Sequence, residues 1–329
     1  MHRNLSILAL VAALLPFAGC SGRHNPSEKY YLVTANAKLT YWQTAALGLS
    51  HAANQLGVQS EMVGPENYDV KAEAQAFRDA LAQKPAGILV SPADSSLLGP
   101  EIDKAIAQGV PVITMDSDAP ASKRISFIGT NNYAAGQIGA RVAAKAIGGK
   151  GNVVVFTMPG QHNLAERLHG YTDVFAEYPQ IHVAQIVDMK GDPSIAFDNT
   201  KQIVEAGKLK PDAWICLEAT ACKEVADVLD RNKVKGSTIV AMDTDQDTLD
   251  WVRKGAIAAT IAQKPFTMAF YGVKMLDDLH HYKPATLSRV WAQDTFSPVP
   301  VFVDTGTTLI DHGNLDEFVQ AQASAKSPQ

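Results

Sequence analysis

The sequence predicts an α/β fold made of two doubly wound parallel-sheet lobes. Short apolar runs alternate with amphipathic stretches along almost the whole chain of 329 residues, as expected for successive βα units with parallel strands. About 310 residues follow an apolar N-terminal segment, enough for two ordinary domains. The alternation runs through two similar rounds and then a shorter tail, which suggests that the chain crosses back between the lobes.

The first round of elements extends to residue 115. Its first helix places Trp42, Leu49 and Ala53 on one face, and Gly57 ends it. The run AGILV is continuously apolar, as in a strand buried on both faces. The predicted strands are 30–34, 58–63, 86–90 and 110–115, and the predicted helices are 42–56, 70–81 and 97–107.

The second round begins after Asn131 and has the same pattern. Its predicted helices are 133–147, 164–176, 195–206 and 223–230, and its predicted strands are 152–157, 183–187, 213–217 and 238–242. A strand at 256–261, a helix at 266–279 and a strand at 299–303 follow without opening a third lobe. We expect the polar stretch after Asn314 to be disordered.

The N-terminus predicts export. Arg3 precedes an apolar stretch over 7–18, which is shorter than the roughly 20 residues of a membrane-spanning helix and typical of a signal peptide. Phe17-Ala18-Gly19-Cys20 resembles the lipobox of bacterial lipoproteins, although Leu is preferred where Phe17 stands. We therefore expect residues 1–19 to be removed, Cys20 to carry a lipid and residues 20–28 to form a tether on a bacterial membrane. The alternative is a plain cleaved signal with an incidental cysteine.

The charge of the chain argues against nucleic-acid binding. The chain has net charge −5, and removal of residues 1–19 deletes one arginine and no acid, giving −6. No basic run of the kind that nucleic acid requires is present.

Export permits a disulfide between Cys216 and Cys222, but two half-buried free thiols are the interpretation that we favour.

Acidic residues follow three of the predicted buried strands. Asp116, Glu218 and Asp243 each come directly after such a strand, and ligands of open parallel sheets bind at the carboxyl ends of the strands. The strong alternative for each acid alone is a helix N-cap or first-turn residue whose carboxylate is satisfied by backbone N–H groups. The recurrence of the pattern in both halves favours a shared binding crevice.

Other residues extend this candidate site. Arg167, in NLAERLHGY, lies early in a predicted helix that points at the same crevice, where a guanidinium fork holds two hydroxyls; a surface salt bridge is the alternative. Tyr41 and Trp42 offer flat faces for a sugar ring, unless they pack into the core. Acids, one arginine and paired aromatic rings suit a neutral polyhydroxylated ring better than an anion.

Five segments carry a family resemblance: VPVITMDSDAP (110–120), FIGTNNYAAG (127–136), NLAERLHGY (163–171), IVAMDTD (239–245) and AATIAQKP (258–265). With them the chain resembles, over about residues 29–306, the periplasmic ribose/galactose-type sugar-binding proteins of ABC importers. The same family supplies the effector domain of LacI-type repressors. The resemblance implies a type I periplasmic binding protein with three hinge crossings, near Thr130/Asn131, Gln263/Lys264 and Asp304/Thr305.

The resemblance also implies lobes and contacts. The N-terminal lobe would comprise 29–130 plus 264–304, and the C-terminal lobe 131–263 plus 305–315, followed by a polar tail at 316–329. The implied ligand-binding residues are Asn36, Tyr41, Trp42, Asp116, Arg167, Glu218, Asp243 and Gln263. Ribose-type proteins have Arg where Ser117 stands and Asn where Glu218 stands, which argues against ribose bound in the same way.

Other chemistry is weakly indicated. GGKGN (148–152) lacks the full phosphate-loop pattern, and the spacing of His162, Glu166 and His169 is a weak metal signal beside the family motif. Paired carboxylates alone are poor evidence for a glycosidase. We therefore expect a monomeric, cofactor-free binding protein, not an enzyme, that delivers a monosaccharide to an ABC permease. The alternatives are a sensory module for a receptor or kinase and a non-sugar polar ligand.

Overall fold

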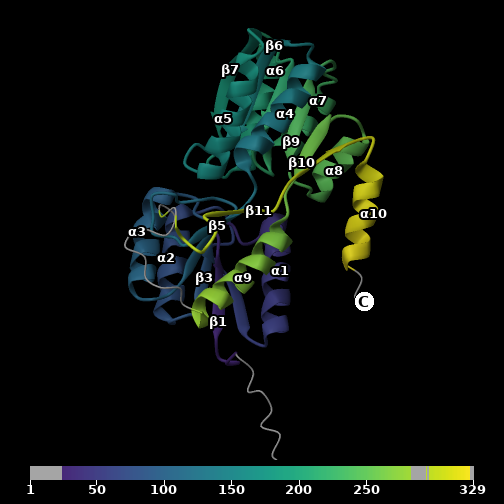
Figure 1. The fold of residues 1–329 in the computed structure, drawn as a ribbon. Helices are drawn as coiled ribbons and strands as arrows, with labels where there is room; N and C mark the ends of the chain where they lie inside the picture. The colour runs from purple at the N-terminus through teal and green to yellow at the C-terminus, as the bar shows by residue number, and fades with distance from the viewer. Residues whose placement is uncertain (1–23, 283–293, 295, 327–329) are drawn as a thin grey trace, which may run out of the picture.

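The computed structural model describes residues 24–282, 294 and 296–326. Two six-stranded sheets, each covered by helices on both faces, form two lobes that lie one above the other in Figure 1. The signal peptide, the lipid on Cys20 and the start of the tether are predictions that fall outside the described residues. Within those residues, no helix is both long and apolar enough to cross a membrane.

The first lobe is built on the sheet β11-β5-β4-β3-β1-β2, whose strands all pair in parallel. The strands are β1 (Lys29–Val33), β2 (Gln59–Val63), β3 (Gly87–Val90), β4 (Val112–Met115), β5 (Ser126–Gly129) and β11 (Phe302–Asp304). The helices are α1 (Thr40–Leu56), α2 (Val70–Ala82), α3 (Ser95–Ala107) and α9 (Pro265–His281). Alternation along β1 sends Leu32 toward α1 and α9 and Val33 toward α2 and α3, so both faces of the sheet are buried.

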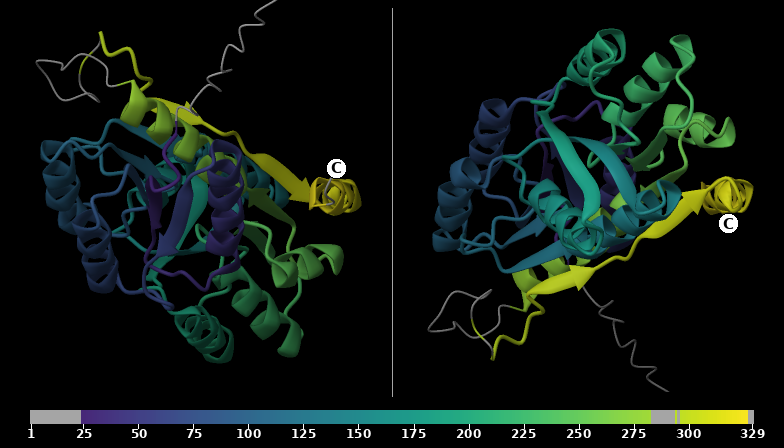
Figure 2. Two further views of the ribbon diagram at one scale, coloured as in Figure 1. Left: turned by 90° about the horizontal axis from the view of Figure 1, so that it is seen from below. Right: turned by 90° about the horizontal axis from the view of Figure 1, so that it is seen from above.

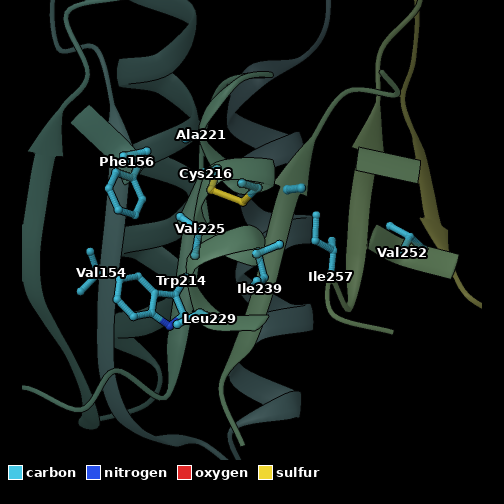
Figure 3. Packing of buried hydrophobic residues seen from close by; sticks show 14 of the residues in the cluster. Val154, Phe156, Trp214, Cys216, Ala221, Val225, Leu229, Ile239, Val252 and Ile257 are labelled. Carbon is cyan, nitrogen blue, oxygen red and sulfur yellow. A yellow bond between two sulfur atoms is a disulfide. The ribbon is translucent and has the colours of Figure 1, made fainter. Parts of the chain in front are cut away.

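The second lobe is built on the sheet β12-β10-β9-β8-β6-β7, in which β12 runs antiparallel to its neighbour β10. The strands are β6 (Lys150–Thr157), β7 (Gln180–Asp188), β8 (Ala213–Cys216), β9 (Thr238–Met242), β10 (Ala259–Ala262) and β12 (Thr308–Asp311). The helices are α4 (Asn132–Ala146), α5 (His162–Ala176), α6 (Pro193–Ala206), α7 (Ala221–Arg231), α8 (Gln246–Arg253) and α10 (Leu315–Lys326). Figure 3 shows one face of this sheet, where Phe156 stacks on the buried Trp214.

The chain passes between the two sheets three times. It crosses between β5 and α4, returns between β10 and α9, and crosses again between β11 and β12. The predicted fold class is therefore confirmed. Side-chain oxygens of Asp69, Asp94, Asn131, Asp192 and Asp245 cap the amino ends of the five helices that follow them, which explains where those helices begin.

The sequence analysis did not predict four of the observed elements: β5, α8, β12 and α10. The expectation of disorder after Asn314 is wrong, because residues 315–326 form α10 at the outer edge of the molecule (Figure 2). Leu315 is buried and Phe318 packs against the core of the second lobe. These two apolar side chains, three residues apart, dock a helix whose other residues are polar or small, apart from the exposed Val319.

The expectation of free, half-buried thiols is also wrong. Cys216, at the end of β8, and Cys222, in the first turn of α7, form a disulfide with their Cα atoms 5.6 Å apart. Both residues are buried in the core shown in Figure 3. The turn between β8 and α7 brings the two cysteines together, and spacing in the sequence does not reveal that distance.

Candidate ligand-binding site

A pocket lies between the lobes, at the carboxyl ends of parallel strands from both sheets. It encloses about 660 Å³ of empty space, including the part that opens to solvent. All eight predicted ligand-binding residues line it: Asn36, Tyr41, Trp42, Asp116, Arg167, Glu218, Asp243 and Gln263. The prediction that these side chains share one crevice agrees with this arrangement.

The two lobes contact each other across the pocket. Asn163 of the second lobe donates from Nδ2 to Asp116 Oδ2 of the first, over 3.1 Å. Gln161 Nε2 donates to the hydroxyl of Tyr68 over 3.2 Å. A Cβ on Gly191, where φ is +76°, would lie 2.2 Å from the Tyr68 ring. These contacts describe a closed arrangement of the lobes.

Asp116 and Asp243 occupy equivalent places in the two lobes. Each follows its strand, β4 or β9, in the left-handed region of the backbone, with φ of 65° and 66°. The amide of Asp116 donates to Ile128 O, and the amide of Asp243 donates to Ile261 O. This conformation costs a non-glycine residue about 1 kcal/mol or more and turns each strand end so that the carboxylate lines the pocket.

Three donors converge on the Asp116 carboxylate. The Tyr41 hydroxyl donates over 2.7 Å, Ser91 Oγ over 3.3 Å, and Asn163 from the other lobe. Burial raises the pKa of Asp116, while the charge of Arg167 and the hydroxyl donors act in the opposite direction. Asp116 is thus a buried carboxylate that both lobes help to hold.

Asp243 is less fully paired. Gln263 Nε2 donates to its Oδ1 over 2.9 Å. Burial raises the pKa of Asp243 to about 7; Arg167 and Gln263 lower it, and the carboxylates of Asp116 and Glu218 raise it further. Within the described part of the chain Oδ2 accepts no hydrogen bond, which leaves it available to a ligand hydroxyl.

Arg167 lies on α5 and is only 2% exposed, so the surface salt-bridge alternative is wrong. Its Nε donates to Asn132 Oδ1 over 2.9 Å, and its Nη1 donates to the Leu217 carbonyl over 2.7 Å. Its Nη2 donates over 2.8 Å to Gln263 Oε1, which also accepts from Thr130 Oγ1. Among the described residues these bonds occupy three of the five guanidinium N–H groups, so two remain for a ligand.

Glu218 has a double role. Its Oε2 accepts from the amide and the hydroxyl of Thr220, and its Oε1 accepts from the amide of Ala221 over 2.7 Å. The alternative that backbone N–H groups at a helix start satisfy this acid is therefore correct: Glu218 accepts from the amides of Thr220, the N-cap of α7, and of Ala221, its first residue. Its carboxylate still lies at the pocket wall, and burial raises its pKa.

The aromatic pair forms one wall of the pocket. Trp42 is 8% exposed and packs into the core of the first lobe, while Tyr41 meets it edge to face with ring centroids 5.0 Å apart. Both rings line the pocket, so core packing and ligand contact are not exclusive here. Asn36 lies half-buried beside them.

Several polar residues at the pocket were not singled out in the sequence. The missed pocket-lining residues with hydrogen-bonding side chains are Thr34, Tyr68, Ser91, Gln161, Asn163 and Thr220. Asn163 stands four residues before Arg167 in NLAERLHGY, so one helical turn places both at the crevice. That spacing was the signal by which the sequence could have identified Asn163. Tyr68 and Gln161 lie in loops, where no sequence pattern marks them as pocket residues.

Two α/β lobes closed over a polar pocket at their strand ends define the bilobed solute-binding proteins. The chain belongs to the periplasmic binding protein family, whose "Periplasmic binding protein domain" model matches residues 30–283. The resemblance stated from the sequence motifs is thereby confirmed.

Relatives and solved structures agree with that assignment. A ribose import binding protein of Bacillus subtilis is 25% identical over 242 residues, covering 72% of this chain and 76% of the relative. An arabinose binding protein from Geobacillus stearothermophilus has a similar structure, with 34% identity, a TM-score of 0.73 and coverage of 89% and 99%. A solute binding protein from Burkholderia graminis, in complex with D-arabinose, gives 26% identity, a TM-score of 0.79 and coverage of 89% and 98%.

Proposed function

We propose that this chain is a lipid-anchored, extracytoplasmic binding protein that captures a monosaccharide between its lobes and delivers it to an ABC importer, without catalysing a reaction. The observation that carries the proposal is the composition of the pocket. Three carboxylates, one guanidinium, several amides and hydroxyls, and three aromatic rings line it. The names of the relatives, which include ribose and D-apiose import binding proteins, support it.

The charges in the pocket favour a neutral ligand. Among the described lining residues, Asp116, Glu218 and Asp243 face a single cation, Arg167. A phosphate or carboxylate would meet like charges at close range in a buried site, which is unfavourable. Sugar hydroxyls donate to carboxylates and accept from guanidinium and amide groups, so one neutral ring satisfies both kinds of partner.

Capture follows from closure of the lobes. A ligand bound to Asp116 on one lobe and Asp243 on the other favours the closed arrangement, because only that arrangement lets it contact both. We propose hinges at the three crossings, with lobes at 29–130 plus 264–304 and 131–263 plus 305–315. We further propose that the protein acts as a monomer tethered through Cys20.

A thermal-shift panel of aldoses, ketoses, polyols, sugar phosphates and amino acids tests this function. A neutral monosaccharide present at a hundred times its Kd stabilises the folded protein by about 2.7 kcal/mol and raises its Tm. Sugar phosphates should give no shift. A response confined to amino acids or to anions would overturn the sugar assignment and leave the fold unaffected.

Sugar binding should weaken as the pH falls through 7. The pKa of Asp243 is about 7 in the protein alone, and a hydroxyl donating to the ionised carboxylate lowers that pKa in the complex. Below pH 7 binding must then release a proton, which costs up to about tenfold in affinity per pH unit. Calorimetry between about pH 8 and pH 6 measures this slope. Asp243→Asn should bind more weakly but lose the slope near pH 7, and a flat profile for the unmodified protein would exclude this role.

A further inference from the structure

A second cluster of polar side chains lies at the end of the first lobe opposite the pocket. It joins His24 and Glu28, just before β1, to Asp277, His280 and His281, at the end of α9. Helix α9 begins near the pocket and runs for 17 residues, about 25 Å, so the cluster is remote from the sugar site. In Figure 1 the start of β1 and the end of α9 meet at the far end of this lobe.

The donor atoms have the spacing of a metal site. His24 Nε2 lies 2.8 Å from Asp277 Oδ2, and His281 Nε2 lies 3.6 Å from Asp277 Oδ1. One ligand atom from each of these three residues lies within 4.8 Å of the others. Two ligand atoms about 2.1 Å from a tetrahedral ion are roughly 3.4 Å apart, so small side-chain movements would place all three around one ion.

The surroundings support a cation. Asp277 is only 5% exposed and accepts a hydrogen bond from the Tyr30 hydroxyl over 3.0 Å, a second partner of the kind that orients metal-binding carboxylates. Asp277 and His281 are four residues apart, so α9 presents both on one face. Among the described residues, no lysine or arginine pairs with Asp277 or Glu28. A divalent ion would balance these two carboxylates.

We propose that His24, Asp277 and His281 bind a divalent transition-metal ion, Zn²⁺ by the chemistry of the donors. Imidazole nitrogen with carboxylate oxygen suits Zn²⁺, whereas Ca²⁺ and Mg²⁺ prefer all-oxygen sites. Glu28, whose Oε2 lies 3.0 Å from His281 Nε2, is the candidate for the fourth ligand.

The site would fasten the tether to the lobe. Four peptide units separate Cys20 from His24, and such a length spans at most about 14 Å. If the lipid is attached at Cys20, as proposed above, a metal bound through His24 holds this end of the lobe close to the membrane. The pocket then lies on the side away from that anchor.

Isothermal titration with Zn²⁺ tests the site in the full chain, extracted in detergent and stripped with chelator. We expect one tightly bound Zn²⁺ per chain and visible absorption bands of tetrahedral Co²⁺ on substitution. His24→Ala should weaken Zn²⁺ binding at least tenfold. His24 precedes β1 and lies outside the core of the lobe, so this variant should fold normally. His182→Ala, an exposed histidine on β7 of the other lobe, is the matched control and should bind Zn²⁺ normally.

Sugar binding by the same proteins separates this proposal from the sugar function. The unmodified chain, His24→Ala and His182→Ala should all bind sugar equally, because the cluster is remote from the pocket. Absence of stoichiometric Zn²⁺ binding by the unmodified chain would overturn the metal site, as would equal binding by His24→Ala and His182→Ala.

Discussion

Replacing Arg167 with lysine should weaken sugar binding by about two orders of magnitude or more. The guanidinium donates to Asn132, Leu217 and Gln263 at once. These bonds fix its plane, and we expect its two remaining N–H groups to donate to the ligand. A lysine ammonium cannot reproduce this fork, so one or more buried acceptors lose their donor. Each hydrogen bond to a charged group contributes about 1.5–3 kcal/mol, and two lost bonds account for the predicted effect.

Calorimetry with the sugar identified by the thermal-shift panel measures the loss. Arg167→Lys keeps the positive charge beside Asp116 and Asp243, so the variant should fold, which circular dichroism verifies. Arg141→Lys is the control, because Arg141 is exposed on α4 and its ion pair with Glu177 spans 3.9 Å at the surface. A folded Arg167→Lys protein with nearly unchanged affinity would show that Arg167 only supports the fold.

The site could be predicted in part because parallel sheets bring strand ends together. Asp116 and Asp243 were identifiable from the strands that precede them, and the structure places both at the pocket. The bond from Asn163 to Asp116 could not be predicted, because it depends on how the two lobes meet. Glu218 illustrates a different limit of prediction. It binds backbone amides at the start of α7 and also lines the pocket, whereas the sequence analysis treated these two roles as alternatives.

The missed parts of the fold have a common physical cause. Strands β5 (SFIG) and β12 (TLID) each contain only two large apolar residues. They lack the longer apolar runs that mark the equally short β3 and β4, and tertiary pairing stabilises them. Helix α10 depends on Leu315 and Phe318 docking on the second lobe. The pairing of Cys216 with Cys222 depends on the turn between β8 and α7. In each case the deciding contact comes from a distant or folded-back segment.

Replacing Gly136 with alanine should both destabilise the protein and impair the binding site. Helices α4 and α5 cross with their backbones in contact: a Cβ on Gly136 would lie 2.1 Å from the carbonyl oxygen of Arg167. The contact is reciprocal, since a Cβ on Gly170 would lie 2.2 Å from the carbonyl oxygen of Tyr133. An added methyl must push the helices apart by about 1 Å, and overpacking of this kind costs about 1–3 kcal/mol.

The displaced backbone is that of Arg167 itself, so the damage should reach the ligand. A shift of about 1 Å in α5 stretches the bonds from Arg167 to Asn132 and Gln263, and we expect affinity to fall tenfold or more. Urea denaturation and calorimetry measure the two effects. Gly99→Ala in α3 is the control, because apart from its chain neighbours the nearest atom to its added Cβ is 3.9 Å away. If Gly136→Ala lost stability yet bound sugar normally, the close helix crossing would serve the fold without positioning Arg167.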